Sequence, residues 1–207
     1  MAKYTGADCR ICRREGCKLF LKGERCTSKK CAMERRPNVP GVHGAARKKA
    51  TEYSLQLREK QKVKKAYGML EKQFRHYYDM ANNMRTGIVG ENMLSLLERR
   101  LDNVVYRMGI GASRKESRQI VNHGHITVNG KTVNIPSFLV KVDDVIAIKE
   151  NKKELPMFKE LKDVKVVMPK WLEFNSEKLT GKINALPQRD DIDLNIREHL
   201  IIELYSK

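Results

Sequence analysis

Apolar residues recur at helical spacing through the middle of the chain. Between residues 93 and 108 they follow the i, i+3/i+4, i+7/i+8 rule without a miss, which predicts one amphipathic helix. Glu98, Arg99, Arg100 and Arg107 occupy its other positions, so we expect them on its polar side. The apolar positions are Met93, Leu96, Leu97, Leu101, Val104, Val105 and Met108.

The same spacing predicts three further helices. One begins near Thr51, a second begins after Gly68 and carries Phe74 and Tyr78, and a short apolar helix runs over Ile196–Tyr205. A cluster of Phe and Tyr side chains beside arginines can stack on nucleic-acid bases. At helical spacing such a cluster is more often part of a core, which is the interpretation we favour.

The stretch from residue 112 to 135 predicts a helix followed by a hairpin. Ser113 and Glu116 have the Ser-x-x-Glu spacing of a capping box, and Gly124 suits the left-handed residue that ends a helix. Asn129-Gly130 joins two alternating apolar runs, which is a strong hairpin signal. A capped helix start with backbone donors and nearby arginines is suited to phosphate.

Short strands are expected in the second half of the chain. Val145–Ile148 follows an Asp-Asp turn and predicts a buried strand, and Trp171–Phe174 and Leu179–Leu186 predict two more. Residues 152–163 are rich in Lys and Glu and predict a helix, while Trp171 is expected in the core.

The chain is strongly basic, with a formal net charge of +17 over 207 residues. The excess is concentrated at the start, because residues 1–50 hold 14 Lys/Arg and 4 Asp/Glu, whereas residues 151–207 hold 11 and 10. Such a basic arm favours a polyanionic partner. No apolar run approaches the roughly 20 residues of a membrane span, and the first residues lack an apolar signal core. We therefore expect a cytoplasmic location and no membrane partner.

All five cysteines lie between residues 9 and 31. Two pairs, Cys9-x2-Cys12 and Cys26-x4-Cys31, are separated by 13 residues, and four thiolates at this spacing suit tetrahedral Zn²⁺. Metal binding would fold a segment too small and polar to bury a core. The alternative is a set of free thiols in a disordered basic tail. Cys17 stands outside the pairs, and we interpret it as a small buried residue rather than a ligand.

A connector follows the cysteines. Residues 35–44 contain two prolines and two glycines, which predicts an extended segment, and the basic cluster Arg47-Lys48-Lys49 comes next. Because these positive charges face almost no acid, a loop that follows a nucleic-acid strand is favoured over a solvated linker. His43 by itself fits a structural role equally well.

Ordered motifs extend along the whole chain. They are Cys9-Arg-Ile-Cys12, Gly23-Glu-Arg-Cys26, Cys31-Ala-Met-Glu-Arg-Arg-Pro37, Pro40-Gly-Val-His-Gly44, Glu59-Lys-Gln-Lys62, Tyr67-Gly-Met-Leu-Glu-Lys-Gln-Phe74, Leu97-Glu-Arg-Arg-Leu-Asp-Asn-Val-Val-Tyr-Arg-Met-Gly109 and His123-Gly-His-Ile-Thr-Val-Asn-Gly130. With them the sequence closely resembles the bacterial small-subunit ribosomal protein S-four family, in its zinc-bearing form. The module from about Leu97 to Lys149 resembles the S-four RNA-binding domain that several RNA-modifying enzymes share.

The resemblance implies an α+β fold in three parts. A zinc-knuckle arm precedes a helical domain and an S-four-type RNA-binding domain with an antiparallel sheet and helices. The implied bounds are 1–45 for the zinc-binding basic arm and connector, 46–92 with the C-terminal helix 195–207 for the helical domain, and 93–187 for the RNA-binding domain, with its core module at 97–150. The helix over Ile196–Tyr205 is expected to pack back on residues 46–90.

The resemblance also implies a function. Family members are structural constituents of the small ribosomal subunit that bind 16S ribosomal RNA early in assembly, at a junction of helices in the 5′ domain. They line the mRNA entrance, affect translational accuracy, and in some bacteria repress translation of their own operon. Expected partners are 16S ribosomal RNA, mRNA at the entrance channel and neighbouring small-subunit ribosomal proteins, with no small-molecule substrate. The family's zinc ligands map onto Cys9, Cys12, Cys26 and Cys31.

Binding is expected to depend on phosphate contacts, because A-form RNA hides its base edges in a deep and narrow groove. We expect three groups of contacts, on the module, beside the metal and on the connector. They are Arg114, Arg118, His123 and Lys131; Arg13, Arg14, Lys18, Lys22 and Arg25; and Arg35, Arg36, His43, Arg47, Lys48 and Lys49.

Two other classes of protein compete with this interpretation. An RNA-modifying enzyme with the same module would need an acid–base pair, a nucleophile or a cofactor loop, and none stands out in the sequence, so we predict no catalytic residues. A zinc-finger DNA regulator would prefer duplex DNA to structured RNA, which a competition experiment distinguishes.

Overall fold

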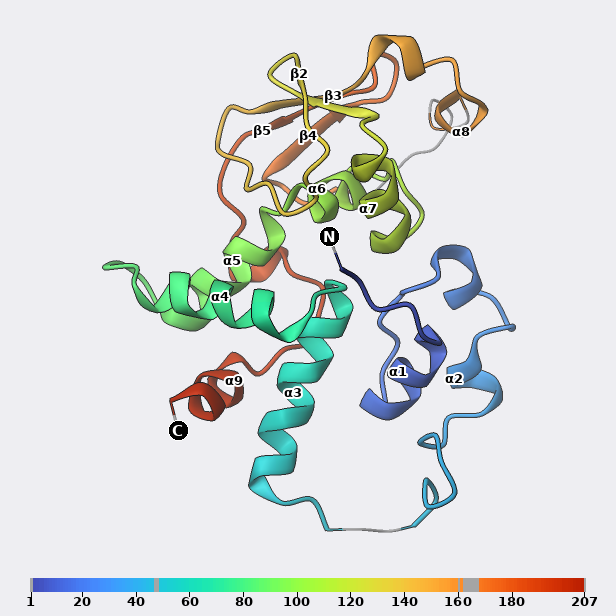
Figure 1. The fold of residues 1–207 in the computed structure, drawn as a ribbon, viewed down its shortest axis with the longest axis vertical. Coiled ribbons are helices and arrows are strands. Elements are labelled where there is room, and N and C mark those ends of the chain that lie inside the picture. The colour runs from blue at the N-terminus through green and yellow to red at the C-terminus, as the bar shows by residue number, and fades with distance from the viewer. Residues whose placement is uncertain (1, 47–48, 160, 162–167, 207) are drawn as a thin grey trace. The chain divides into compact units, whose positions relative to one another are not determined.

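The computed structural model describes residues 2–46, 49–159, 161 and 168–206, and the chain forms two compact units (Figure 1). Unit 1 comprises Met1–Met93 and Leu194–Lys207, and unit 2 comprises Leu94–Asp193. The finer three-part division expected from the resemblance stays a prediction. Unit 1 contains α1 (Asp8–Glu15), η1 (Gly23–Cys26), α2 (Ala32–Arg35), α3 (Glu52–Ala66), α4 (Glu71–Asn82) and α9 (Glu198–Tyr205), and α5 (Val89–Glu98) begins in it.

The long helix α3 begins at a capped residue and packs against the last helix of the chain. The Thr51 side chain accepts a hydrogen bond from Ser54 N at 3.3 Å, which explains the start near Thr51 predicted above. Gln56 Nε2 donates to Glu203 of α9 at 3.0 Å (Figure 1). Arg197 N, just before α9, donates to Glu59 Oε1 at 2.9 Å. The expectation that the closing helix packs back on residues 46–90 is therefore confirmed.

The aromatic cluster of α4 is core. Phe74 and Tyr77 are buried, and the Tyr78 ring lies 4.8 Å from the ring of Tyr205 in α9. The Tyr205 hydroxyl donates to Glu71 Oε1 at 2.8 Å. Packing of α4 against α9, rather than base stacking, accounts for these side chains.

The first 46 residues contain two short helices that the sequence pattern did not predict. Ile11, Leu19 and Leu21 are buried there, and α1 ends at Gly16, whose φ of +68° is a conformation that glycine adopts without strain. Arg58 of α3 forms an ion pair with Glu15 of α1 at 3.0 Å, which attaches α1 to α3.

The prediction of one helix between residues 93 and 108 is wrong, because the chain breaks it at Arg99 and Arg100. Helix α5 ends at Glu98 and α6 (Leu101–Arg107) begins after Arg100, which is extended with ψ of 135°. The backbone of Arg100 pairs with Leu139, and Leu101 N donates to Phe138 O at 2.9 Å. A backbone segment from later in the chain therefore occupies the place where the helix would have continued.

Unit 2 contains an antiparallel sheet in the order β2-β1-β3-β5-β4. Buried residues of α6, α7, β1, β3, β4 and β5 form one apolar core, so the two helices cover one face of the sheet (Figure 1). The elements are α6, α7 (Arg114–Asn122), β1 (Ile126–Val128), β2 (Lys131–Thr132), β3 (Val145–Ile148), η2 (Glu150–Lys152), α8 (Pro156–Lys159), β4 (Leu172–Asn175), β5 (Thr180–Ile183) and η4 (Arg189–Asp191).

The hairpin turn is as predicted, but its second strand is short. Asn129 and Gly130 have φ of +51° and +78°, as a type I′ turn requires, and Val128 pairs with Lys131. Strand β2 ends at Thr132, and Val133 N still donates to Ile126 O of β1 at 3.1 Å. The apolar run leaves the sheet after Val133, and Ile135 is 52% exposed.

The remaining strand predictions are confirmed, and the fold class is α+β. Strands β3, β4 and β5 lie where the sequence predicted them, and Trp171 is buried. The helix predicted over 152–163 is limited to α8 among the described residues, and 160 and 162–167 lie outside them. None of the helices in the described part of the chain combines the length and apolarity needed to cross a bilayer.

Glu71 is expected to stabilise unit 1 through its three hydrogen-bond partners. Burial alone would raise the pKa of Glu71, but hydrogen bonds from Lys60, Lys64 and Tyr205 lower it to about 2. A carboxylate whose pKa falls on folding contributes stability above its unfolded pKa and loses that contribution as the pH falls toward 2. Because the side chain is 45% exposed, screening limits the loss in Glu71→Gln to about 1 kcal/mol at pH 7.

Urea denaturation at pH 7 and at pH 3 measures this contribution. The difference between wild type and Glu71→Gln should be smaller at pH 3. Glu34→Gln, which removes a single ion pair with Lys18 from a similarly exposed carboxylate, should change little at either pH. Equal losses for Glu71→Gln at the two pH values would contradict the assignment.

Candidate nucleic-acid interface

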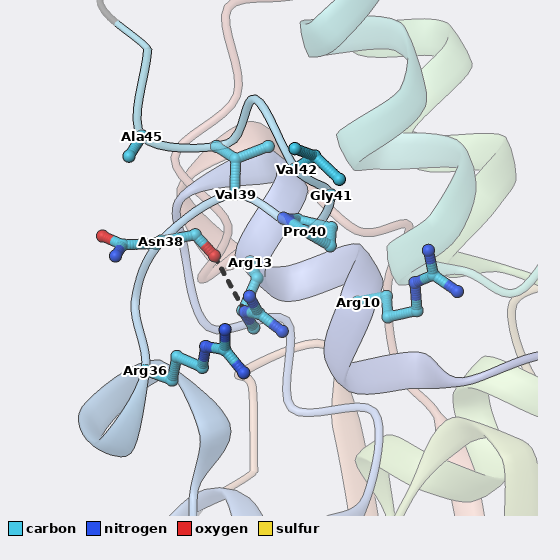
Figure 2. A pocket seen from close by; sticks show the side chains of 9 residues that line it. All are labelled: Arg10, Arg13, Arg36, Asn38, Val39, Pro40, Gly41, Val42 and Ala45. Atoms are coloured by element: carbon cyan, nitrogen blue, oxygen red, sulfur yellow. Dashed lines mark hydrogen bonds between the residues drawn. The ribbon is translucent and has the colours of Figure 1, made fainter.

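Two adjoining hollows lie along the loop from Asn38 to Ala46 in unit 1. The first, which we call the arginine hollow, has a volume of about 610 Å³ (Figure 2). It is lined by Arg10, Arg13, Arg36, Asn38, Val39, Pro40, Gly41, Val42 and Ala45. The second hollow has a volume of about 580 Å³ and shares the wall from Val39 to Val42.

Two glycines shape this loop. Gly41 has φ of +110°, a conformation that residues with a Cβ rarely adopt. An added Cβ at Gly44 would collide with the Val39 carbonyl oxygen, so the chain can fold back on itself only with glycine there. Hydrogen bonds from Gly44 N to Gly41 O and from Ala46 N to His43 O, at 3.2 and 3.1 Å, close the turn. The connector is therefore a compact loop rather than a fully extended segment.

Arginines from two short helices bring positive charge to the arginine hollow. Arg10 and Arg13 lie three residues apart on α1, and Arg36 directly follows α2. Arg13 donates from Nε to Asn38 O at 2.8 Å, which ties the loop to α1. Figure 2 shows the guanidinium groups of Arg13 and Arg36 close together below the loop, with Arg10 farther along α1. No Asp or Glu is among the described residues that line the hollow.

The second hollow adds further basic residues to the same surface. Arg14, His43 and Lys49 line it, all three are exposed, and its described lining likewise includes no carboxylate. The expected contact set left out Arg10. Its spacing from Arg13 would have indicated a shared helical face, had the short helix α1 been predicted.

The other basic residues expected beside the metal and on the connector occupy varied surroundings. Lys22, Arg25 and Arg35 are exposed, but Lys18 forms an ion pair with Glu34 at 2.5 Å, which offsets its charge. Arg47 and Lys48 lie outside the described residues.

The cysteines lie in the interior of the N-terminal segment. Cys12, Cys26 and Cys31 are buried, Cys9 is half-buried, and Lys22 N donates to Cys26 Sγ at 3.4 Å. Burial raises the pKa of the Cys12 thiol, and the nearby Cys26 and Cys9 raise it further. Within the described ranges, no three or more His, Cys, Asp or Glu side chains are arranged as a metal site.

Cys17 also lies partly inside this segment. It is half-buried, and burial raises the pKa of its thiol above the usual value. Its partial exposure is greater than the sequence interpretation of a small buried residue supposed.

In unit 2 the predicted cap starts helix α7. The Ser113 hydroxyl accepts a hydrogen bond from Glu116 N at 3.3 Å. The Glu116 carboxylate accepts from Ala112 N at 2.8 Å, one residue earlier than the reciprocal bond of a capping box. Gly124, with φ of +68°, follows the helix as predicted.

Arg118, which was expected among the phosphate contacts, is buried rather than exposed. Its side chain is 4% exposed, and its Nη1 lies 3.1 Å from Asp102 Oδ2. Asp102 also pairs with the fully buried Arg100 at 2.8 Å. One carboxylate therefore pairs with two buried arginines, while Arg118 Nε and Nη2 have no hydrogen-bond partner among the described residues.

Arg114 is half-exposed and is held in place by the buried Asn103 and the half-buried Tyr106. Its Nε donates to Asn103 Oδ1 at 2.8 Å, and its guanidinium lies 4.5 Å from the centre of the Tyr106 ring. Asn103 in turn donates to Glu98, which forms an ion pair with Arg107 at 3.0 Å. Burial alone would lower the pKa of Arg107, but hydrogen bonds to Glu98 and Asp193 raise it.

His123 and Lys131 are exposed on the hairpin side of α7, as a surface contact requires. The neighbouring His125 is half-buried, with its ring 5.8 Å from that of Phe158. Burial lowers the pKa of His125, and His123 and Lys152 lower it further. Its neutral form is therefore favoured, whereas His123 faces solvent.

The basic hollows and the capped helix-and-hairpin module are features of a protein that binds a polyanion such as nucleic acid. Residues 3–98 match the family described as "Ribosomal protein S4/S9 N-terminal domain", and residues 99–146 match "S4 domain". Over the full length of both chains, the sequence is 62% identical to "Small ribosomal subunit protein uS4" of Ruminiclostridium cellulolyticum and 63% identical to that of Caldicellulosiruptor saccharolyticus. The protein of the same name from Clostridioides difficile is 62% identical. The chain belongs to the uS4 family of small-subunit ribosomal proteins, which are structural and not enzymes.

Asp102 is expected to be critical for the stability of unit 2. Asp102→Asn removes the carboxylate that pairs with the buried Arg100 and Arg118, which should cost about 3 kcal/mol or more. The free energy of unfolding from urea denaturation measures the loss. Asp143→Asn is the matched control, because it makes the same change in an exposed pair with Lys182 and should cost little. A similarly small loss for both variants would refute this role of Asp102.

Proposed function

We propose that this protein is a structural constituent of the small ribosomal subunit that binds 16S ribosomal RNA and acts in the cytoplasm. The observation that carries the proposal is the pair of basic hollows, whose described linings include no carboxylate. The relatives also support the proposal. Proteins that are 57–63% identical to this chain over its full length are called small ribosomal subunit protein uS4.

The arginines of the hollows are suited to phosphate. A guanidinium group presents two parallel N–H donors to two phosphate oxygens, which gives orientation as well as charge. Exposed Arg10, Arg14 and Arg36 are available for this, and Arg13 holds the loop. Each phosphate contact releases counterions, so affinity falls as salt rises.

The second contact surface is on unit 2. The exposed His123 and Lys131 and the half-exposed Arg114 lie on the helix-and-hairpin module. Arg118 is left out of this surface and instead acts inside the fold. Contacts with mRNA at the entrance channel and with neighbouring small-subunit proteins are part of the proposal on the strength of the family resemblance alone.

Zn²⁺ is the proposed cofactor of the N-terminal segment. Cys9, Cys12, Cys26 and Cys31 would hold it as thiolates, and the ion would supply a crosslink to a segment with few buried apolar residues. The donor chemistry fits, because three of these thiols are buried and a backbone N–H points at Cys26 Sγ.

Loss of one hollow arginine is expected to weaken RNA binding and reduce its salt dependence. Arg36→Gln should lower the slope of log K against log salt by about 0.7 to 0.9 for one lost phosphate contact. Filter binding to a transcript of the 16S 5′ domain, across a salt series, measures the slope. Arg85→Gln removes an exposed arginine of unit 1 outside the hollows and should leave the slope unchanged. An unchanged slope in Arg36→Gln, or equal competition by duplex DNA, would count against the proposal.

Removal of the metal is expected to unfold residues 2–46 while α3, α4 and unit 2 stay folded. Amide hydrogen exchange of the purified protein before and after chelation measures this directly, and metal analysis should give one zinc per chain. Cys26→Ser should lose the metal, whereas Cys17→Ser should keep it. Protein purified without metal, or protection that survives chelation, would exclude the zinc site.

A further inference from the structure

We propose that the arginine hollow takes one unpaired nucleotide of the bound RNA, with its phosphate on the guanidinium groups and its base against the apolar wall of the loop. This inference rests on the proposed function, because the nucleotide belongs to that RNA. The nucleotide site would add a contact with a base to a surface that would otherwise recognise only the RNA backbone.

The hollow has the size and the wall that such a site needs. Its volume of about 610 Å³ falls in the range of roughly 300 to 1,000 Å³ that is usual for small-molecule sites. Val39, Pro40 and Val42 form its apolar wall (Figure 2). Val42 is 96% exposed, so its side chain contributes almost nothing to the core and is available to pack against a ligand.

The positive charge of the arginine hollow is suited to the phosphate group of the nucleotide. Arg10, Arg13 and Arg36 come from two different short helices, and no carboxylate among the described lining residues offsets them. Arg13 is already oriented by its bond to Asn38 O, which reduces the entropy lost when a phosphate binds. The anionic group is therefore expected at the Arg13 and Arg36 side of the hollow.

The apolar wall accounts for the selection of an unpaired nucleotide. In a duplex, bases are stacked and paired, so a protein surface meets phosphates, sugars and base edges, but not the faces of the bases. A base in a junction or bulge can turn outward and pack against side chains. Backbone contacts alone would not distinguish these two cases, so Val42 and its neighbours carry the distinction.

The full-length protein with its metal and a transcript of the 16S 5′ domain provide the test. Val42→Ser should weaken binding about fivefold, because roughly one kcal/mol of apolar contact is lost, and it should leave the salt slope unchanged. Ile88→Ser is the matched control, an exposed apolar residue of unit 1 outside the hollow, and it should bind like wild type. Both substituted side chains are exposed, so folding should be retained.

Chemical probing of unpaired nucleotides in the same complexes locates the ligand. One unpaired nucleotide should be protected by the wild-type protein and Ile88→Ser, and should regain its reactivity with Val42→Ser. Wild-type affinity and an unaltered footprint in Val42→Ser would overturn the nucleotide site while leaving the proposed function intact. If the wild-type protein itself fails to bind the transcript, the proposed function and this inference fall together.

Discussion

Buried ion pairs around α6 are the interaction on which the structure of unit 2 depends. Placing an arginine in the interior is unfavourable unless a carboxylate compensates it, and Arg100 is fully buried. Asp102 is only two residues away, so a continuous helix would have directed the two side chains to different faces. The extended backbone at Arg100 allows the pair to form, and it also gives Leu139 a place to pair. The same carboxylate reaches Arg118 and thereby fixes α7.

This arrangement divides the basic residues into those that the fold uses and those that remain available for a partner. In unit 2, Arg100, Arg107 and Arg118 are buried in ion pairs, and Arg99 donates to Val140 O. Along the loop in unit 1, by contrast, exposed arginines face no described carboxylate in the hollow linings. The net charge of +17 does not show how unevenly the charge available to a partner is distributed. Many arginines of unit 2 are used inside the fold, whereas those along the loop in unit 1 remain available.

Local signals explain why much of the fold could be predicted from the sequence. The Thr51 and Ser113 caps and the Asn129-Gly130 turn each depend on residues that are close in sequence, and all three form as expected. The break before α6 could not be predicted, because a charged residue at a helical position ordinarily faces solvent. The Leu139 backbone that pairs with Arg100 also comes from far along the chain. The burial of Arg118 was missed for the same reason. Only part of the candidate site could be predicted. The composition indicated basic residues, but the hollow depends on the close approach of Gly44 to Val39, which the sequence does not reveal.

The stability of the N-terminal segment and its capacity to bind RNA are thermodynamically linked. An eight-residue helix such as α1 is marginal by itself, and the apolar burial around it is limited to a few side chains. The ion pair between Arg58 and Glu15 and the bond between Arg13 and Asn38 attach it, but both are partly exposed and contribute modestly. Any ligand that binds only the folded segment stabilises it, by an amount that grows with the logarithm of the ligand concentration relative to its dissociation constant. In the proposed zinc-bound state, the metal orders the same helices that present the arginines, so metal and RNA should each strengthen the binding of the other.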